Sequence, residues 1–349
     1  MPTLQASARR IHWGFLRSAR FDLALIAGCL ALALLAGAVV VVWPALFVTV
    51  LLCDLWFLSY HHVVATFTRI GFDRESFRQH RFVVLALPGI IAVGTLAAVK
   101  LVGLWIVPSV YFYWQWLHYA RQSYGISRIY QLKTGPAAER KDALGNAMLY
   151  LVAATGVLHR SAQGWTRFLD VELRLLPVPR LAVWLVGVAA AGAVIAWAGR
   201  EIRRARAGQL EGAYTLYLGS HLVVFAIGYL IIDAIDAGWL VVNVWHNAQY
   251  LLLVWLYNSN RFKAGLSPRH RFLSWLSQAR RWPVYVACCL LVTTVFYGGL
   301  AGLTAAFASS TVPVLLIAYQ VINFHHYVVD ALVWKVRRRP VREALGIVA

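Results

Sequence analysis

Long apolar runs, about ten of them and each long enough to cross a lipid bilayer as a helix, dominate this chain. Within the hydrocarbon region the backbone must satisfy its own hydrogen bonds, so only α-helices and closed β-barrels can span it. The runs are long and continuous, whereas barrel strands are short and alternate between apolar and polar residues. We therefore predict an all-α, polytopic transmembrane helical bundle of about ten helices. The predicted spans are 22–43, 45–69, 81–99, 101–127, 142–159, 180–199, 213–233, 237–259, 283–305 and 312–335.

The composition agrees with helices that are solvated by lipid, since 60% of the 349 residues are hydrophobic and only 13% are charged. The formal charge of +19 would fit a nucleic-acid binder, but the basic residues lie between the apolar runs and not on one soluble face, so no nucleic-acid partner is expected. The first run continues into the second without a cleavage site, which indicates a retained helix and not a signal peptide. No linker separates the runs, and residues 1–349 are predicted to form a single integral membrane domain.

Lysine and arginine cluster at both ends of the chain and in alternate loops, in the ranges 9–20, 69–81, 121–141, 200–206, 261–281 and 335–342. Because such loops stay on the cytoplasmic side, both termini are predicted to be cytoplasmic, in a bacterial inner membrane, with the helices arranged as five hairpins. One arginine-bearing segment, 160–180, falls on the outer side. Its apolar residues recur at helical spacing, which predicts a helix lying in the membrane interface.

A short histidine motif recurs in the second helix of four of the five hairpins. It reads Tyr60-His61-His62, Leu117-His118-Tyr119, Trp245-His246-Asn247 and Phe324-His325-His326. Ionisable residues at bilayer depth are costly and usually face the interior of a bundle. A single buried histidine is most often a hydrogen-bonded core residue. Several on separate helices at similar depth are what a metal ion requires, because neutral imidazole coordinates a metal without burying negative charge.

Helix spacing selects among the candidate ligands. His326 has Asn323 at i−3 and Asp330 at i+4, whereas the neighbours of His325 on its own stripe are apolar, so His326 is favoured within that pair. Spacing does not decide between His61 and His62. His221 shares a stripe with two tyrosines and is a ligand, a substrate contact or a packed polar residue. The candidate metal ligands are His61, His62, His118, His221, His246, His325 and His326.

Three charged residues complete the candidate site. Asp54 precedes His61 by seven residues and Asp330 follows His326 by four, so both are predicted to orient ligating histidines. The alternative role for each aspartate is a polar clamp between helices. Arg121, one turn after His118, is predicted either to hold a carboxylate or phosphate group or to extend to the cytoplasmic surface.

In these motifs the chain resembles the histidine-rich integral-membrane non-haem iron oxygenases. In architecture it is similar to the Brp/Blh carotene dioxygenases, a family that spreads single histidine motifs over several helices, some followed by an aspartate as His326 is by Asp330. The resemblance implies non-haem iron, dioxygen and a lipophilic substrate. The chain departs from that family in lacking two histidines spaced by three residues on one helix, and from the membrane desaturases in lacking HxxHH boxes.

These observations favour a membrane-embedded metalloenzyme, a non-haem iron oxidoreductase or oxygenase that acts on a lipophilic small molecule. Zinc, copper and manganese are the alternative metals. The expected partners are the lipid bilayer, the substrate and an electron-donor protein. Two other functions use the same residues: a proton-coupled transporter that relays protons through buried His and Asp, and a bis-histidine haem protein that carries electrons. A purely structural role would leave the buried imidazoles unexplained.

Overall fold

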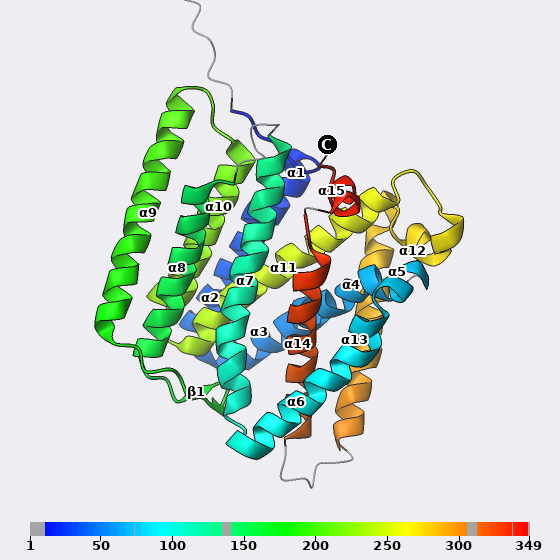
Figure 1. The fold of residues 1–349 in the computed structure, drawn as a ribbon, viewed down its shortest axis with the longest axis horizontal. Coiled ribbons are helices and arrows are strands. Elements are labelled where there is room, and N and C mark those ends of the chain that lie inside the picture. The colour runs from blue at the N-terminus through cyan, green and yellow to red at the C-terminus, as the bar shows by residue number, and fades with distance from the viewer. Residues whose placement is uncertain (1–10, 73, 135–140, 306–312, 337, 348–349) are drawn as a thin grey trace, which may run out of the picture.

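The computed structural model describes residues 11–72, 74–134, 141–305, 313–336 and 338–347. The protein is all-α in these ranges apart from one two-stranded hairpin, and each of the ten predicted spans overlaps a helix (Figure 1). The start of the basic segment predicted at 9–20 lies outside the described residues.

Several apolar runs form helices that contain one π-helical turn. The first combines α1 (Ala19–Leu23), η1 (Ala24–Gly28) and α2 (Cys29–Val42). After the 3₁₀ turn η2 (Pro44–Leu46), the second combines α3 (Phe47–Asp54), η3 (Leu55–Ser59) and α4 (Tyr60–Ile70). The short α5 (Arg74–Gln79) leads into η4 (Phe82–Ala86) and α6 (Leu87–Val102). A π-turn inserts one residue into the helical repeat, so it changes which residues share a face on its two sides.

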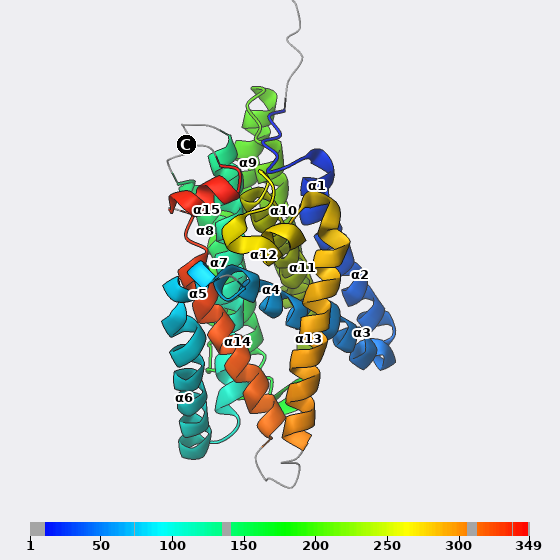
Figure 2. The ribbon, with the colours of Figure 1, turned by 90° about the vertical axis from the view of Figure 1, so that its right-hand side faces the viewer.

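The remaining helices follow in chain order. They are α7 (Ile106–Lys133), α8 (Ala143–Ala162), α9 (Arg180–Arg206), α10 (Gly212–Ala226) with η6 (Ile227–Ile231), α11 (Ile235–Arg261), η7 (Pro268–His270), α12 (Arg271–Leu276), η8 (Ala279–Arg281), α13 (Trp282–Ala305), α14 (Val314–Val333) and α15 (Arg339–Ala344). In Figure 2, α6, α14 and α13 stand side by side, and α14 packs on both of its neighbours.

Within the described part of the chain, six helical segments are long and apolar enough to cross a membrane, as expected of an integral membrane protein: Ala19–Val42, Pro44–Ile70, Phe82–Val102, Arg180–Arg206, Gly212–Ile231 and Ala279–Ala305. The outer face of α9 shows this character directly, since Leu181, Trp184 and Ile195 are each about 70% exposed. The helices α7, α11 and α14 do not belong to the six. They carry three of the four histidine motifs, and the polar residues around those motifs lower their hydropathy.

Helix α11 forms the centre of the bundle. Every residue from Ala237 to Tyr250 is buried, and Figure 1 shows the helix running obliquely through the middle of the molecule. It comes very close to η6, where a Cβ atom on Gly238 would collide with the carbonyl oxygen of Gly228. Small residues allow helix backbones to approach in this way. Polar groups on α11 are therefore shielded from both lipid and water.

The segment 160–180 is not an interfacial helix, so that prediction is wrong. α8 ends at Ala162, and β1 (Arg167–Phe168) pairs antiparallel with β2 (Val171–Glu172). The turn between the two strands places Leu169 and Asp170 at φ of 48° and 63°, a left-handed conformation that an α-helix does not accommodate. The helical spacing of the apolar residues was coincidental here.

Candidate metal centre

Four imidazoles from four different helices meet in the interior of the bundle. They belong to His62 on α4, His118 on α7, His246 on α11 and His326 on α14, and each residue is at most 8% exposed. The ring centroids lie 4.5 Å apart for His62 and His326, 4.8 Å for His118 and His246, 5.2 Å for His118 and His326, and 5.5 Å for His62 and His246. Each ring thus contacts two of the others.

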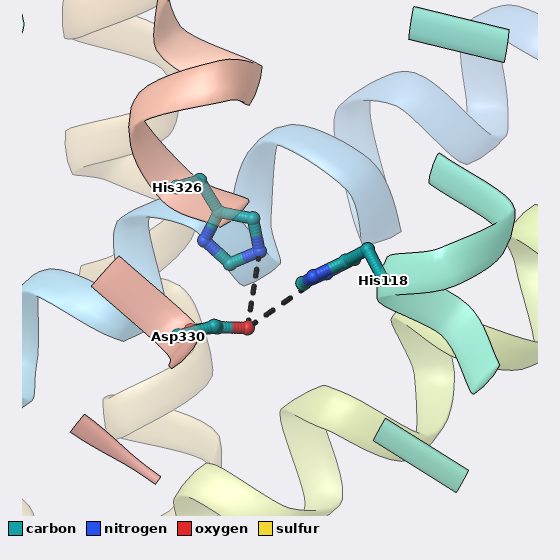
Figure 3. Close-up of side chains that lie close together, drawn as sticks. All are labelled: His118, His326 and Asp330. Atoms are coloured by element: carbon teal, nitrogen blue, oxygen red, sulfur yellow. Dashed lines mark ion pairs between the residues drawn. The ribbon is translucent and has the colours of Figure 1, made fainter. Parts of the chain in front are cut away.

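Asp330 adds a carboxylate to this cluster from the turn of α14 that follows His326 (Figure 3). Its Oδ2 atom lies 3.4 Å from His326 Nε2 and 3.8 Å from His118 Nε2. One ligand atom from each of these three residues falls within 4.8 Å of the other two. Two imidazoles and one carboxylate arranged in this way form the donor set that non-haem iron sites commonly use.

Ring nitrogens in the cluster lack hydrogen-bond partners. In the described ranges, neither nitrogen of His246 has one, and the same holds for Nδ1 of His62 and Nε2 of His118. Buried polar atoms are nearly always paired, because an unpaired one costs the full desolvation penalty of the group. Neutral imidazole also offers a lone pair as a metal ligand. The donor atoms that are present therefore fit a metal ion.

Thr66 and Tyr250 fix the geometry of His326 and Asp330. Thr66 Oγ1 donates to the carbonyl oxygen of His62 and lies 3.3 Å from Nδ1 of His326, so we assign the proton of that imidazole to Nδ1 and the lone pair to Nε2. Nε2 of His326 then faces Nε2 of His62 at 3.0 Å. Tyr250 donates to Asp330 Oδ1 at 2.7 Å and contacts Thr66 Oγ1 at 2.8 Å. Ligand support of this kind sets the tautomer and the ring orientation at metal sites.

Asp54 lies in a second buried network and forms no hydrogen bond with an imidazole among the described residues. Its carboxylate accepts from Ser59 at 2.9 Å, from Asn243 at 2.6 Å and from Asn247 at 3.4 Å. The two asparagines flank His246 in the sequence of α11. Asp54 therefore helps to fix the helix that carries His246.

The phenol of Tyr119 joins the two networks. It donates to Asn243 Oδ1 at 2.6 Å, and its ring lies 4.4 Å from the His246 ring. Sequence reasoning missed Tyr119, Thr66 and Trp334 as supporting residues. Thr66 and Trp334 each follow a cluster residue, His62 and Asp330, by one helical turn, and this spacing was the available signal.

The other predicted residues lie outside the cluster. His61 binds the Phe57 carbonyl through Nδ1, and His325 binds the Val83 carbonyl through Nε2. His221 uses both nitrogens, on Ser123 Oγ and on the Leu149 carbonyl, each at 3.0 Å. Arg121 is exposed on α7 beside Tyr150. Among the described residues, none of these four side chains has a ring contact with the clustered imidazoles.

Comparisons with protein-family models, with curated proteins and with solved structures give no match for this chain.

Proposed function

We propose that the protein is a membrane-embedded metalloenzyme, a non-haem iron oxidoreductase that acts on a lipophilic substrate. The observation that carries the proposal is the convergence of His62, His118, His246 and His326 with Asp330, with ring nitrogens left unpaired in the interior of an apolar bundle. Four neutral imidazoles and one carboxylate suit iron, while zinc, copper and manganese share much of this ligand preference.

His118, His326 and Asp330 are the residues best placed to hold the ion, and His62 and His246 complete its surroundings. A bound metal with an open position would polarise or activate an oxygen-containing reactant. The chain itself supplies orientation and the exclusion of water. Tyr250 holds one oxygen of Asp330 so that the other faces the imidazoles, and Thr66 keeps the Nε2 lone pair of His326 directed toward the same point.

Aromatic residues line one side of the cluster and support an apolar substrate. The Tyr327 ring stacks on His118 with centroids 4.3 Å apart, and Trp114 stacks on Phe324 at 5.4 Å. These rings come from α7 and α14. We propose that a lipophilic substrate enters laterally from the bilayer on this side, and that an electron-donor protein docks on the basic end of the bundle.

We also propose ten membrane spans in five hairpins, with both termini cytoplasmic in a bacterial inner membrane. The described chain begins and ends at the same end of the bundle, where α15 also lies (Figure 1). Alkaline phosphatase fused after Ala234, in the loop before α11, should be active, and the same enzyme fused after Ala349 should be inactive. Activity of the C-terminal fusion would contradict this orientation and indicate the opposite one.

Two histidines that are next to cluster histidines in the sequence, His325 and His61, serve as matched controls for the metal proposal. His326→Ala and His62→Ala should each lower the bound iron per protein at least tenfold, because each removes a clustered imidazole. His325→Ala and His61→Ala should leave the iron content near that of the wild type, since both rings bind backbone carbonyls elsewhere. Elemental analysis of the purified protein measures the metal directly. Equal effects within both pairs, or wild-type protein without stoichiometric metal, would contradict the proposal.

The two alternative functions give different results with the same preparation. A bis-histidine haem protein shows a Soret band, which a bare iron site lacks. A proton-coupled transporter shows proton-dependent uptake into vesicles that persists after the metal is removed. In that case the buried Asp54 network would be the leading candidate for its proton site.

A further inference from the structure

Arg69 is a buried cation near the proposed metal centre. It lies in the last turn of α4, seven residues after His62, which is about 10 Å along a helix. The residue is only 7% exposed. Among the described residues, no carboxylate lies within ion-pair distance of its guanidinium group, although a buried charge is costly without a partner.

Two aromatic rings contact the guanidinium group. Its carbon atom lies 3.9 Å from the centre of the Tyr257 ring and 3.9 Å from the centre of the Trp334 ring, and these two rings are themselves nearly perpendicular, with centroids 5.6 Å apart. Nη1 is buried and has no hydrogen-bond partner in the part of the chain that the structure describes. Tyr257 and Asp330 also interact electrostatically with the guanidinium group, but the Nη1 donors are left without an oxygen acceptor among the described residues. Planar donors of this kind match the oxygens of a carboxylate or a phosphate.

The same tryptophan connects this cation to the candidate metal centre. Trp334 Nε1 donates to the Tyr250 hydroxyl at 2.9 Å, and Tyr250 donates to Asp330 at 2.7 Å. A divalent ion held by neutral imidazoles and Asp330 would, together with Arg69, leave two excess positive charges in the interior. A bound anion offsets part of that excess.

We propose that Arg69 binds the anionic head group of an amphiphile, through its carboxylate or phosphate oxygens, while the apolar chain of that molecule extends toward the four imidazoles. The statement that this ligand is the substrate rests on the proposed function. The anion site itself depends only on Arg69, Tyr257 and Trp334. It makes the substrate an anionic lipid-like molecule and not a neutral hydrocarbon.

Quenching of Trp334 fluorescence tests the site without any enzyme assay. The protein is placed in nanodiscs of phosphatidylcholine, and a fatty acid brominated near its carboxylate is added, with its methyl ester as the uncharged control. The chain has 15 tryptophans, so the signal of interest is the part of the quenching that Trp334→Phe removes. The acid should quench saturably and bind at least tenfold more tightly than the ester. Equal binding of acid and ester would overturn the proposal.

Variants of Arg69 test the assignment to this residue. Arg69→Gln should weaken binding of the acid at least tenfold and leave binding of the ester unchanged. Arg69→Lys keeps the charge but loses the planar fork, so it should bind the acid with intermediate affinity even if the glutamine variant fails to fold. Wild-type affinity for the acid in a folded Arg69→Gln protein would contradict the proposal.

Two further measurements are made. The first distinguishes a fatty acid from a phospholipid as the source of the anion, and the second distinguishes failure of the anion site from failure of the proposed function. Brominated phosphatidylglycerol replaces the fatty acid in a parallel series, and Arg69-dependent quenching by this lipid alone would identify a phospholipid head group as the ligand. Metal content is measured on the same samples. Arg69-dependent binding in a protein that contains no metal would support the anion site and contradict the proposed function. Stoichiometric metal without Arg69-dependent binding would support the proposed function and contradict the anion site.

Discussion

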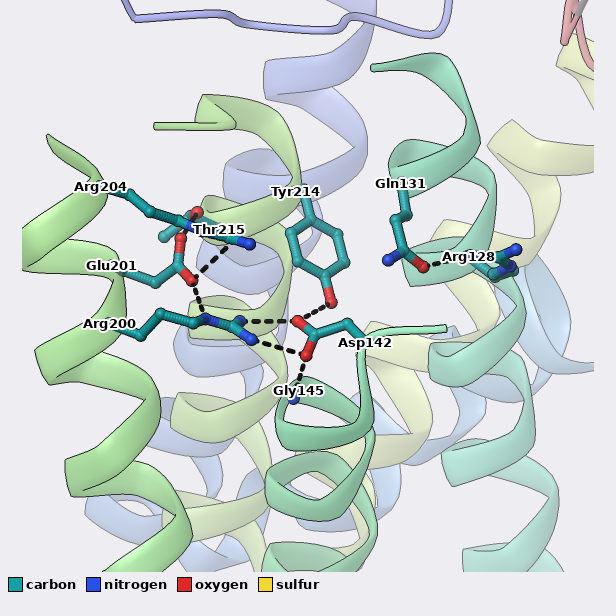
Figure 4. A network of polar contacts seen from close by, with 9 residues as sticks. All are labelled: Arg128, Gln131, Asp142, Gly145, Arg200, Glu201, Arg204, Tyr214 and Thr215. Atoms are coloured by element: carbon teal, nitrogen blue, oxygen red, sulfur yellow. Dashed lines mark hydrogen bonds and ion pairs between the residues drawn. The ribbon is translucent and has the colours of Figure 1, made fainter. Parts of the chain in front are cut away.

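Two buried polar clusters in this protein differ in whether they are complete. At one end of α8, α9 and α10, Asp142 accepts hydrogen bonds from both terminal nitrogens of Arg200 at 2.6 Å and from Tyr214 at 2.8 Å (Figure 4). Glu201 pairs with Arg200 and Arg204. Two acids face two arginines, and the charges balance. The histidine cluster has one carboxylate and several unpaired nitrogens, so it needs a ligand that the chain does not supply.

The same contrast separates two single histidines. His221 and His246 are both at most 1% exposed, yet His221 has a partner on each nitrogen and His246 has none among the residues that the structure describes. Burial alone therefore does not distinguish a structural histidine from a candidate ligand. Between these two residues the difference lies in the pairing of the ring nitrogens, since His221 is satisfied by the chain itself and His246 has lone pairs and donors to offer a ligand.

The largest expected difference between the clusters is in metal binding. Asp330→Asn removes the only carboxylate of the candidate metal site among the described residues, and it should lower metal affinity about 100-fold. Asp142→Asn changes the same chemical group in the complete cluster and should leave metal affinity unchanged. Competition with a chelator, followed by elemental analysis, measures both. A similar loss in the two variants would indicate general destabilisation and remove the distinction.

The next largest effect is expected in stability. Arg200→Gln leaves Asp142 and Glu201 without their shared cation, which should cost about 2 kcal/mol, less than the loss for a fully buried pair because Arg200 is 19% exposed. Thermal unfolding in detergent, followed by circular dichroism, measures the change. The metal content of the folded fraction should not change. Unaltered stability would show that solvent or lipid head groups replace the arginine.

Substitution of His221 and of His246 should have smaller effects on the stability of the metal-free protein, and only the loss of His221 should be destabilising. His221→Phe leaves Ser123 Oγ and the Leu149 carbonyl without a partner and should cost about 1 kcal/mol. His246→Phe removes two unpaired nitrogens and should leave the metal-free protein equally stable or slightly more stable. Unfolding after chelation compares the two variants. Destabilisation by both substitutions to the same degree would mean that His246 is a structural residue.

Much of the site could be predicted from helical spacing, and the failures have a physical cause. His326 was favoured over His325 because Asp330 and Asn323 share its stripe, and the structure places His326 in the cluster. Asp54 was expected to orient His61 at i−7. The π-turn η3 lies between them and shifts the helical register, so Asp54 bonds to Asn243 and Asn247 instead. A single π-turn is not visible in an apolar sequence.

Packing between distant segments also could not be predicted. Spacing left His61 and His62 equivalent, and only the approach of α14 to α4 places His62 opposite His326. The contacts of Arg69 with Tyr257 and Trp334 depend in the same way on the packing of α4, α11 and the residue after α14. Apolar periodicity identifies which face of a helix is buried, but it does not identify the helix that covers that face.

The smallest expected effect is a pH dependence of the complete cluster. Asp142 precedes α8, and although burial raises its pKa, the hydrogen bonds from Arg200, the Gly145 amide and Tyr214 lower it to about 2 overall. Since this pKa is depressed on folding, the stabilisation is fully present above the unfolded value near 4 and is lost as the pH falls through about 2. Wild-type protein should therefore unfold at a lower temperature at pH 3 than at pH 5. In Arg200→Gln this decrease should be smaller, because the largest cause of the depressed pKa is gone. An equal decrease in both proteins would assign the acid sensitivity to other carboxylates and leave the Asp142 cluster without a measurable electrostatic role.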